Sequence, residues 1–139
     1  MADRIPKEQF LRENGYLFIH PVGKSMLPLI RGGLDTVALA PPDELRAGDV
    51  VWYRREDGSE VLHRVLRVEG DTLDLCGDNQ IWVERGVKRA QVLGVMRGFY
   101  RSERYIDTKS AGYRLYVRVW RHLLLRRVIL KALRTLGKV

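Results

Sequence analysis

The sequence predicts a mainly β fold, an irregular antiparallel β-barrel-like domain with a short N-terminal helix and a basic, helical C-terminal tail. Three observations lead to this prediction. Short runs of β-branched and aromatic residues recur at close spacing between turn signals, an Asp-Gly pair separates two such runs, and the segment after residue 108 carries a helical pattern instead. The length of 139 residues is enough for one hydrophobic core.

The first part of the chain predicts one helix followed by short strands. Residues 6–14 are good helix formers and run into Gly15, a common helix stop. Residues 16–22 and 36–39 are rich in aromatic and β-branched side chains, which favour strands, and a loop with proline and glycine separates them.

A β-hairpin is predicted next. Residues 49–55 and 60–68 flank Asp57-Gly58, a strong two-residue turn signal. Strict alternation along the second arm predicts one face with Val61, His63, Val65 and Arg67, and an opposite face with Leu62, Arg64, Leu66 and Val68. Further short strands are expected at residues 72–75, 81–84, 92–100 and 104–106.

The tail, residues 113–139, is helical in character, but its apolar positions do not form one stripe. Between Tyr113 and Leu124 they share one face, and from Val128 to Leu136 they occupy a face rotated by more than a right angle. Two helical halves, each packing on something different, explain this pattern better than one straight helix.

The net charge of +8 lies entirely in this tail. Residues 109–139 hold nine Lys or Arg and no acidic residue, whereas residues 1–108 hold sixteen basic and seventeen acidic residues. Such a tail fits an anionic membrane surface, and the candidate contacts are Arg118, Trp120, Arg121, Arg126 and Arg127. The alternative is a helix packed on the body with its arginines in solvent. Nucleic acid is disfavoured as a partner, because no recognised binding motif accompanies the charge.

The composition also narrows the setting. No apolar run is long enough to span a membrane, and the polar first ten residues do not resemble a signal peptide. A cytoplasmic protein, peripheral at the inner membrane face through its tail, is therefore expected. The single cysteine, Cys76, excludes an internal disulfide framework and a multi-cysteine metal site, and neither metal nor cofactor is predicted.

Three short segments carry candidate chemistry. In Gly23-Lys24-Ser25 a glycine lets backbone approach a serine closely, as an oxyanion hole requires, although the same tripeptide also suits an ordinary turn. His63 could be a packing histidine or a general base. Asp78, in Gly-Asp-Asn, could belong to a turn or could orient an imidazole ring.

The order of these segments is similar to the sequence boxes of the signal peptidase I and LexA-like serine peptidase superfamily. Ser-Met-x-Pro at residue 25, Gly-Asp-Val-Val at 48, His-Arg-Val at 63 and Gly-Asp-Asn at 77 lie within residues 22–95. The resemblance implies an irregular antiparallel β domain in which Ser25 attacks a peptide carbonyl and His63, as in the histidine-type members, is the base. Lys24 is expected to point away from its neighbour Ser25, and Lys88 stays an open alternative as base.

The same resemblance assigns the remaining site residues. Asp78 would hold the His63 ring, the backbone of Gly23, Ser25 and Met26 would supply the oxyanion donors, and Met26 and Pro28 would line the substrate groove. Residues 1–108 are then the peptidase domain and residues 109–139 an extension, with no N-terminal membrane anchor.

The implied function is a serine endopeptidase that removes a leader or signal-like segment from a peptide or protein precursor. Two other functions stay open at this point. One is a catalytically silent barrel that binds a peptide in the same groove, and the other is a membrane-surface adaptor that acts through the basic tail.

Overall fold

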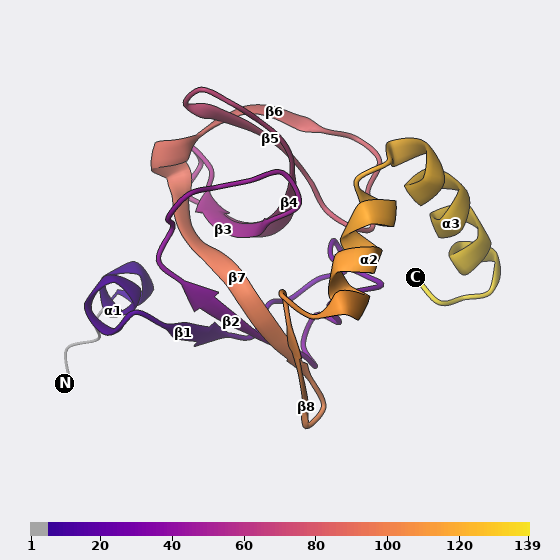
Figure 1. Cartoon of the computed structure of the whole chain (residues 1–139), viewed down its shortest axis with the longest axis horizontal. Helices are drawn as coiled ribbons and strands as arrows, with labels where there is room; N and C mark the ends of the chain where they lie inside the picture. Colours follow the sequence, from indigo (N-terminus) through magenta and orange to yellow (C-terminus); the bar gives the residue numbers. More distant parts are fainter. Residues whose placement is uncertain (1–5) are drawn as a thin grey trace.

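The computed structural model describes residues 6–139 and shows a coiled antiparallel sheet with one helix near the N-terminus and two at the C-terminal end (Figure 1). The strands are β1 (Leu17–Ile19), β2 (Thr36–Ala40), β3 (Val50–Arg54), β4 (Glu60–Glu69), β5 (Thr72–Cys76), β6 (Glu84–Lys88), β7 (Val92–Arg101) and β8 (Arg104–Asp107). Their spatial order is β1-β2-β7-β3-β4-β5-β6, and β8 pairs with β7. The helices are α1 (Lys7–Asn14), α2 (Ala111–Trp120) and α3 (Leu123–Thr135), with a short 3-10 turn at Arg89–Gln91.

The predicted fold class is confirmed, and most predicted elements agree with the observed ones to within a few residues. Helix α1 ends at Gly15, whose φ of 81° is the left-handed conformation that glycine adopts readily. The predicted strand at residues 81–84 is wrong. β6 begins only at Glu84, because Ile81 and Trp82 belong to an exposed loop that leads away from the Gly-Asp-Asn turn.

A β-bulge in β4 corrects the predicted alternation of its side chains. The pairing of β4 with β5 shifts between Val65 and Arg67, so that Leu66 is an additional residue. Beyond the bulge the two faces exchange, and Val68 packs with Val65 in the same cluster rather than on the face of Leu62.

Coiling of the sheet creates two hydrophobic clusters, and β3 contributes to both. Val50 and Trp52 face one cluster together with α1 and α2, while Val51 and Tyr53 face the other, which β4, β5 and β6 complete. All four side chains are buried. A strand that is buried on both faces fixes the position of its neighbours, and β4, which carries His63, is one of them.

The two C-terminal helices pack on the barrel. Tyr113 of α2 belongs to the first hydrophobic cluster, Trp120 at the end of α2 is 4% exposed, and Leu130 of α3 is fully buried. The predicted division of the tail into two helical halves is confirmed, with Arg121 and His122 between them. Within residues 6–139, none of the helices combines the length and the apolar character that crossing a bilayer requires.

Replacing Trp120 with alanine tests this packing. The substitution removes a large buried side chain, and we expect the free energy of unfolding to fall by about 3 to 5 kcal/mol in urea denaturation. Leu115→Ala on the same helix is the control, because Leu115 is 64% exposed and its loss should change stability by less than about 0.5 kcal/mol. Equal effects of the two substitutions would contradict the observed packing of α2.

Candidate active site

Ser25 lies in the turn-rich loop between β1 and β2 and is partly buried. Gly23, two residues earlier, has a φ of 87°, and Gly32 packs so closely on its backbone that a Cβ at position 32 would overlap the Gly23 carbonyl. Within residues 6–139 the amides of Ser25 and Met26 donate no hydrogen bond. The loop therefore combines a serine hydroxyl with two backbone amides that have no acceptor in the described part of the chain, and an acyl-transfer site needs both kinds of group.

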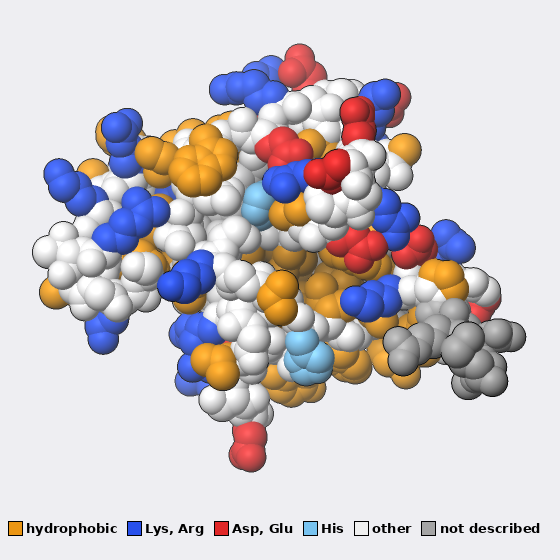
Figure 2. All heavy atoms as spheres, turned by 180° about the vertical axis from the view of Figure 1, so that it is seen from behind, with side chains coloured by type: hydrophobic (Ala, Val, Ile, Leu, Met, Phe, Trp, Pro, Cys, Tyr) orange, Lys and Arg blue, Asp and Glu red, His pale blue; other side chains and the backbone are white. Residues whose placement is uncertain are grey.

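A cavity of about 240 Å³ opens beside Ser25. Figure 2 shows this side of the molecule as a hollow with a hydrophobic floor. Met26, one of the two residues predicted for the substrate groove, lines the cavity and is itself buried. Pro28 does not line it, which corrects that part of the prediction, because Pro28 faces a separate groove beside β8 and α2. The other lining residues are Lys7, Ile19, His20, Pro21, Val22, Gly23, Ile30, Gly32, Trp52, Glu60, Val61 and Leu62.

The Gly77-Asp78-Asn79 turn is joined to the loop that carries Ser25. The Asn79 amide donates to the Ser25 carbonyl at 2.8 Å, and its side-chain Nδ2 donates to the Lys24 carbonyl at 3.0 Å. A Cβ on Gly77 would lie 2.6 Å from the Ser25 carbonyl oxygen, so only glycine permits this approach. The two sequence motifs thus form one structural unit.

Asp78 is fully buried. The prediction that its carboxylate holds the His63 ring is wrong, because the carboxylate has other partners. Its two oxygens accept hydrogen bonds from Arg64 Nε and Nη2, both at 2.8 Å, and from the Tyr116 hydroxyl at 2.8 Å. Arg64 directly follows His63 on β4, and the alternation of the strand sends the two side chains to opposite faces. The aspartate therefore anchors the strand that carries His63 instead of orienting the ring.

Arg126 of α3 is fully buried against the same turn. Its guanidinium donates to the carbonyls of Gly77 and Trp120 and lies 3.7 Å from an Asp78 oxygen. Trp120 donates its Nε1 hydrogen to the Asp78 carbonyl at 2.7 Å. The prediction that Trp120 and Arg126 contact a membrane is therefore wrong, because both side chains are buried. The other three predicted contacts, Arg118, Arg121 and Arg127, are exposed.

The His63 ring faces the second hydrophobic cluster and contacts the Tyr53 hydroxyl. That hydroxyl donates its one hydrogen to Glu84 Oε1 at 2.7 Å, so in its 3.2 Å contact with His63 Nδ1 it accepts. Arg55 also holds the Glu84 carboxylate, with its Nη2 2.8 Å from the same Oε1. This chain of contacts places a hydrogen on Nδ1 and leaves the lone pair on Nε2.

His63 Nε2 forms no hydrogen bond within the described residues, and no buried side-chain nitrogen or oxygen there lacks a partner. Nε2 is therefore accessible to solvent although the ring is largely buried. Burial lowers the pKa of His63 to about 4, the positive charge of Arg55 adds to this effect, and Glu84 and Asp78 oppose it. The imidazole is consequently neutral at neutral pH.

Ser25 and His63 are not hydrogen-bonded to each other in the described part of the chain, and His63 is not among the residues that line the Ser25 cavity. Its neighbours Val61 and Leu62 do line it. The catalytic roles of Ser25 and His63 stay predictions. Lys88, the open alternative as base, is exposed at the end of β6 and does not line the cavity.

Sequence reasoning missed Tyr53, Glu84 and Gly32 among the residues that hold this site together, and it assigned Arg126 to a membrane contact instead. Tyr53 and Glu84 are 31 residues apart and meet only because β3, β4, β5 and β6 are consecutive in the sheet. One signal in the sequence could have identified the role of Asp78. Arg64 lies among apolar strand residues, and a buried arginine requires a buried acidic partner.

A family model described as peptidase S24-like matches residues 2–97. The matched region extends from α1 through most of β7 and includes the Ser25 loop, His63 and the Gly77-Asp78-Asn79 turn. Helices α2 and α3 lie outside it. A comparison with curated proteins finds no match.

The buried, neutral state of His63 can be measured. We expect its ring resonances to titrate with a midpoint near pH 4 in NMR. The unfolded chain binds the same proton near pH 6.5, so stability should fall as the pH drops from 6.5 toward 4, by up to about 1.4 kcal/mol per pH unit. His63→Gln should lack this contribution to the slope. A midpoint near 6.5 would contradict the observed burial.

Proposed function

Because the chain belongs to the peptidase S24-like family, we propose that it is a serine endopeptidase in which Ser25 is the nucleophile and His63 the general base. The observation that carries this proposal is the chain of contacts from Glu84 through Tyr53 to His63 Nδ1. It fixes the tautomer whose free lone pair is on Nε2, the form that a general base requires.

The proposed reaction is acyl transfer. Ser25 Oγ attacks the carbonyl carbon of the scissile peptide while its proton passes to His63 Nε2, and the carbonyl oxygen becomes an oxyanion facing the amides of Ser25 and Met26. The imidazolium then gives its proton to the leaving amine as the C–N bond breaks. Water, deprotonated by the same nitrogen, hydrolyses the acyl-enzyme and restores Ser25. Bound substrate would bring Oγ and Nε2 into contact, since catalytic hydrogen bonds are often long in free enzymes.

The substrate we propose is an extended peptide, a leader or signal-like segment of a precursor. β1 is at one edge of the sheet, and its last residue, Ile19, lines the Ser25 cavity together with residues 20–23 that follow it. An extended peptide could add to this edge by backbone hydrogen bonds and place a side chain in the cavity. The floor of the cavity, with Ile30, Trp52 and Leu62, favours an apolar side chain.

Mass spectrometry of a mixed peptide library incubated with the protein tests this function. The wild type should cleave a subset of peptides, and Ser25→Ala should cleave none. His63→Ala should be slower by roughly two to four powers of ten, the usual contribution of a general base. Both variants should retain the wild-type circular dichroism spectrum, because neither substitution removes a member of a hydrophobic cluster.

Cleavage that persists in Ser25→Ala would contradict the proposed nucleophile. If wild type and variants leave the library equally intact but bind peptides from it, the protein is the silent peptide-binding barrel instead. Isothermal titration with the retained peptides distinguishes that function from a general absence of binding.

Tyr53→Phe tests the proposed orientation of the ring. Removing the hydroxyl frees Nδ1, so we expect kcat to fall by roughly a hundredfold with KM little changed, as for a misplaced catalytic group. Nitrogen chemical shifts of His63 should change from the Nδ1-H tautomer to a mixture of the two. Tyr100→Phe is the control, because Tyr100 lies on β7 away from His63. An unchanged tautomer in Tyr53→Phe would show that Tyr53 does not position the ring.

A further inference from the structure

Helix α3 exposes an apolar stripe on the side that faces away from the barrel. Leu124, Val128, Ala132 and Leu136 follow one another at intervals of four residues and therefore lie on one face. Leu124 is 75%, Val128 62% and Leu136 70% exposed. The opposite face, with Arg126 and Leu130, is the one that packs on the body.

This arrangement is unusual in its direction, because a helix normally buries leucines and exposes arginines. Here the buried arginine is held by the carbonyls of Gly77 and Gln80, so the helix cannot rotate its leucines inward without losing those contacts. The orientation of the exposed stripe is thus fixed by the fold.

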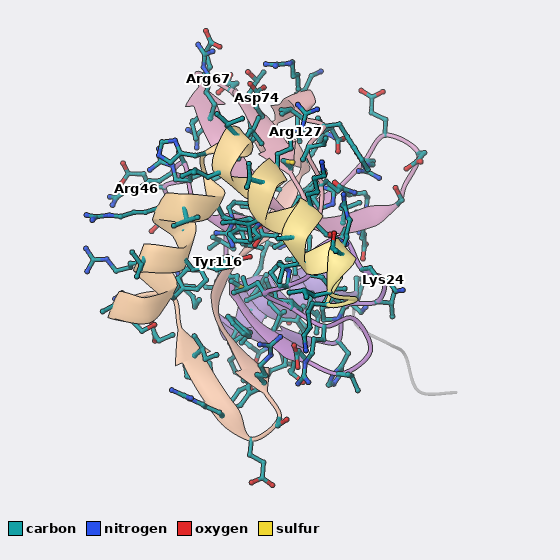
Figure 3. The ribbon with its side chains drawn as sticks, turned by 90° about the vertical axis from the view of Figure 1, so that its right-hand side faces the viewer. Lys24, Arg46, Arg67, Asp74, Tyr116 and Arg127 are labelled. Carbon is teal, nitrogen blue, oxygen red and sulfur yellow. The ribbon has the colours of Figure 1, made fainter. Side chains whose placement is uncertain are left out.

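Cations border the stripe. Arg127 and Lys131 are exposed, and because they follow Leu124 and Val128 by three residues they are their neighbours on the helix surface. Arg127, Lys131 and Arg134 share a shallow cavity with Ile81, and next to it Trp82 is also exposed. Residues 109–139 contain no acidic residue. Figure 2 shows Lys and Arg with hydrophobic side chains, and no Asp or Glu, on the side where α2 and α3 lie, and Figure 3 looks onto that side.

A second copy of the chain does not fit this face. Pairing two α3 helices through their leucines would bring the Arg127 and Lys131 rows of both copies together, with no acidic residue on either helix to offset the repulsion. A nucleic acid would match the cations but would leave the exposed leucines without an apolar partner.

We propose that the outer face of α3, bordered by Arg127 and Lys131 and extended by Ile81 and Trp82, docks on the surface of an anionic lipid bilayer. The leucines and Val128 would enter the acyl boundary while the cations stay at the level of the anionic headgroups, as in interfacial amphipathic helices. A tryptophan suits the same depth. The proposal does not depend on the proposed peptidase activity.

Sedimentation with vesicles tests this docking directly. The full chain should sediment with vesicles of phosphatidylcholine and phosphatidylglycerol in equal parts, and stay in the supernatant with vesicles of phosphatidylcholine alone. The double variant R127Q/K131Q should bind at least about tenfold more weakly, since each cation near such a surface contributes about fivefold. The double variant L124Q/V128Q should also bind at least about tenfold more weakly, because the binding of an interfacial helix scales with the apolar area that it buries. Circular dichroism should be unchanged in both, because the replaced side chains are exposed.

Matched controls separate docking from general attraction. Leu34→Gln replaces an equally exposed leucine between β1 and β2, and R12Q/R104Q removes two exposed cations from α1 and β8, so both should bind like wild type. Wild type that stays in solution with anionic vesicles would overturn the proposal. So would L124Q/V128Q binding as wild type does, which would indicate adsorption by charge alone. A wild-type dimer in light scattering that L124Q/V128Q converts to monomer would identify a second copy as the occupant.

Discussion

The buried carboxylate of Asp78 joins four parts of the chain that are distant in sequence. Arg64 reaches it from β4, Tyr116 from α2 and Arg126 from α3, while the following residue, Asn79, bonds to the Ser25 loop. Burying these charges costs desolvation free energy, so the net stabilisation is modest, but removing one partner leaves an uncompensated buried charge and costs about 3 to 5 kcal/mol. The strand that carries His63, the loop that carries Ser25 and the C-terminal helices are therefore positioned together.

The contacts of Asp78 explain why the sequence singled out these segments but predicted the wrong partner for the aspartate. Ser25, His63 and Asp78 stand out by residue type and order, and the turn signal at Asp57-Gly58 placed β3 and β4 correctly. The aspartate of the Gly-Asp-Asn segment can bind the histidine of the His-Arg-Val segment or the arginine beside it, and the alternation along β4 places Arg64, not His63, on the side of Asp78. That alternation was readable, but the bulge at Leu66 and the pairing that brings Glu84 to Tyr53 depend on the register of four strands, which no local pattern encodes.

The C-terminal helices show a second limit of sequence reasoning. Periodicity correctly divided the tail into two helices, yet hydropathy would bury Leu124 and expose Arg126, and the structure does the opposite. The reason is chemical and local: the carbonyl oxygens of Gly77 and Gln80 need donors, and a guanidinium supplies several in one plane. With Arg126 held in this way, the apolar stripe of α3 faces outward, beside the exposed Arg127 and Lys131.

The surroundings of His63 bear in two ways on the role of general base that we propose for it. Burial against the second hydrophobic cluster holds the ring in place but weakens its affinity for a proton. Although burial opposes it, hydrogen bonds from Arg55 and Tyr53 keep the pKa of Glu84 below its usual value, so a negative charge is maintained behind the ring. Arg55 acts in both directions, since it keeps Glu84 ionised and also repels an imidazolium. A proton transferred to Nε2 would be stabilised through Nδ1 and the Tyr53 hydroxyl by Glu84. The same three residues thus set both the geometry of the ring and the free energy of its protonation.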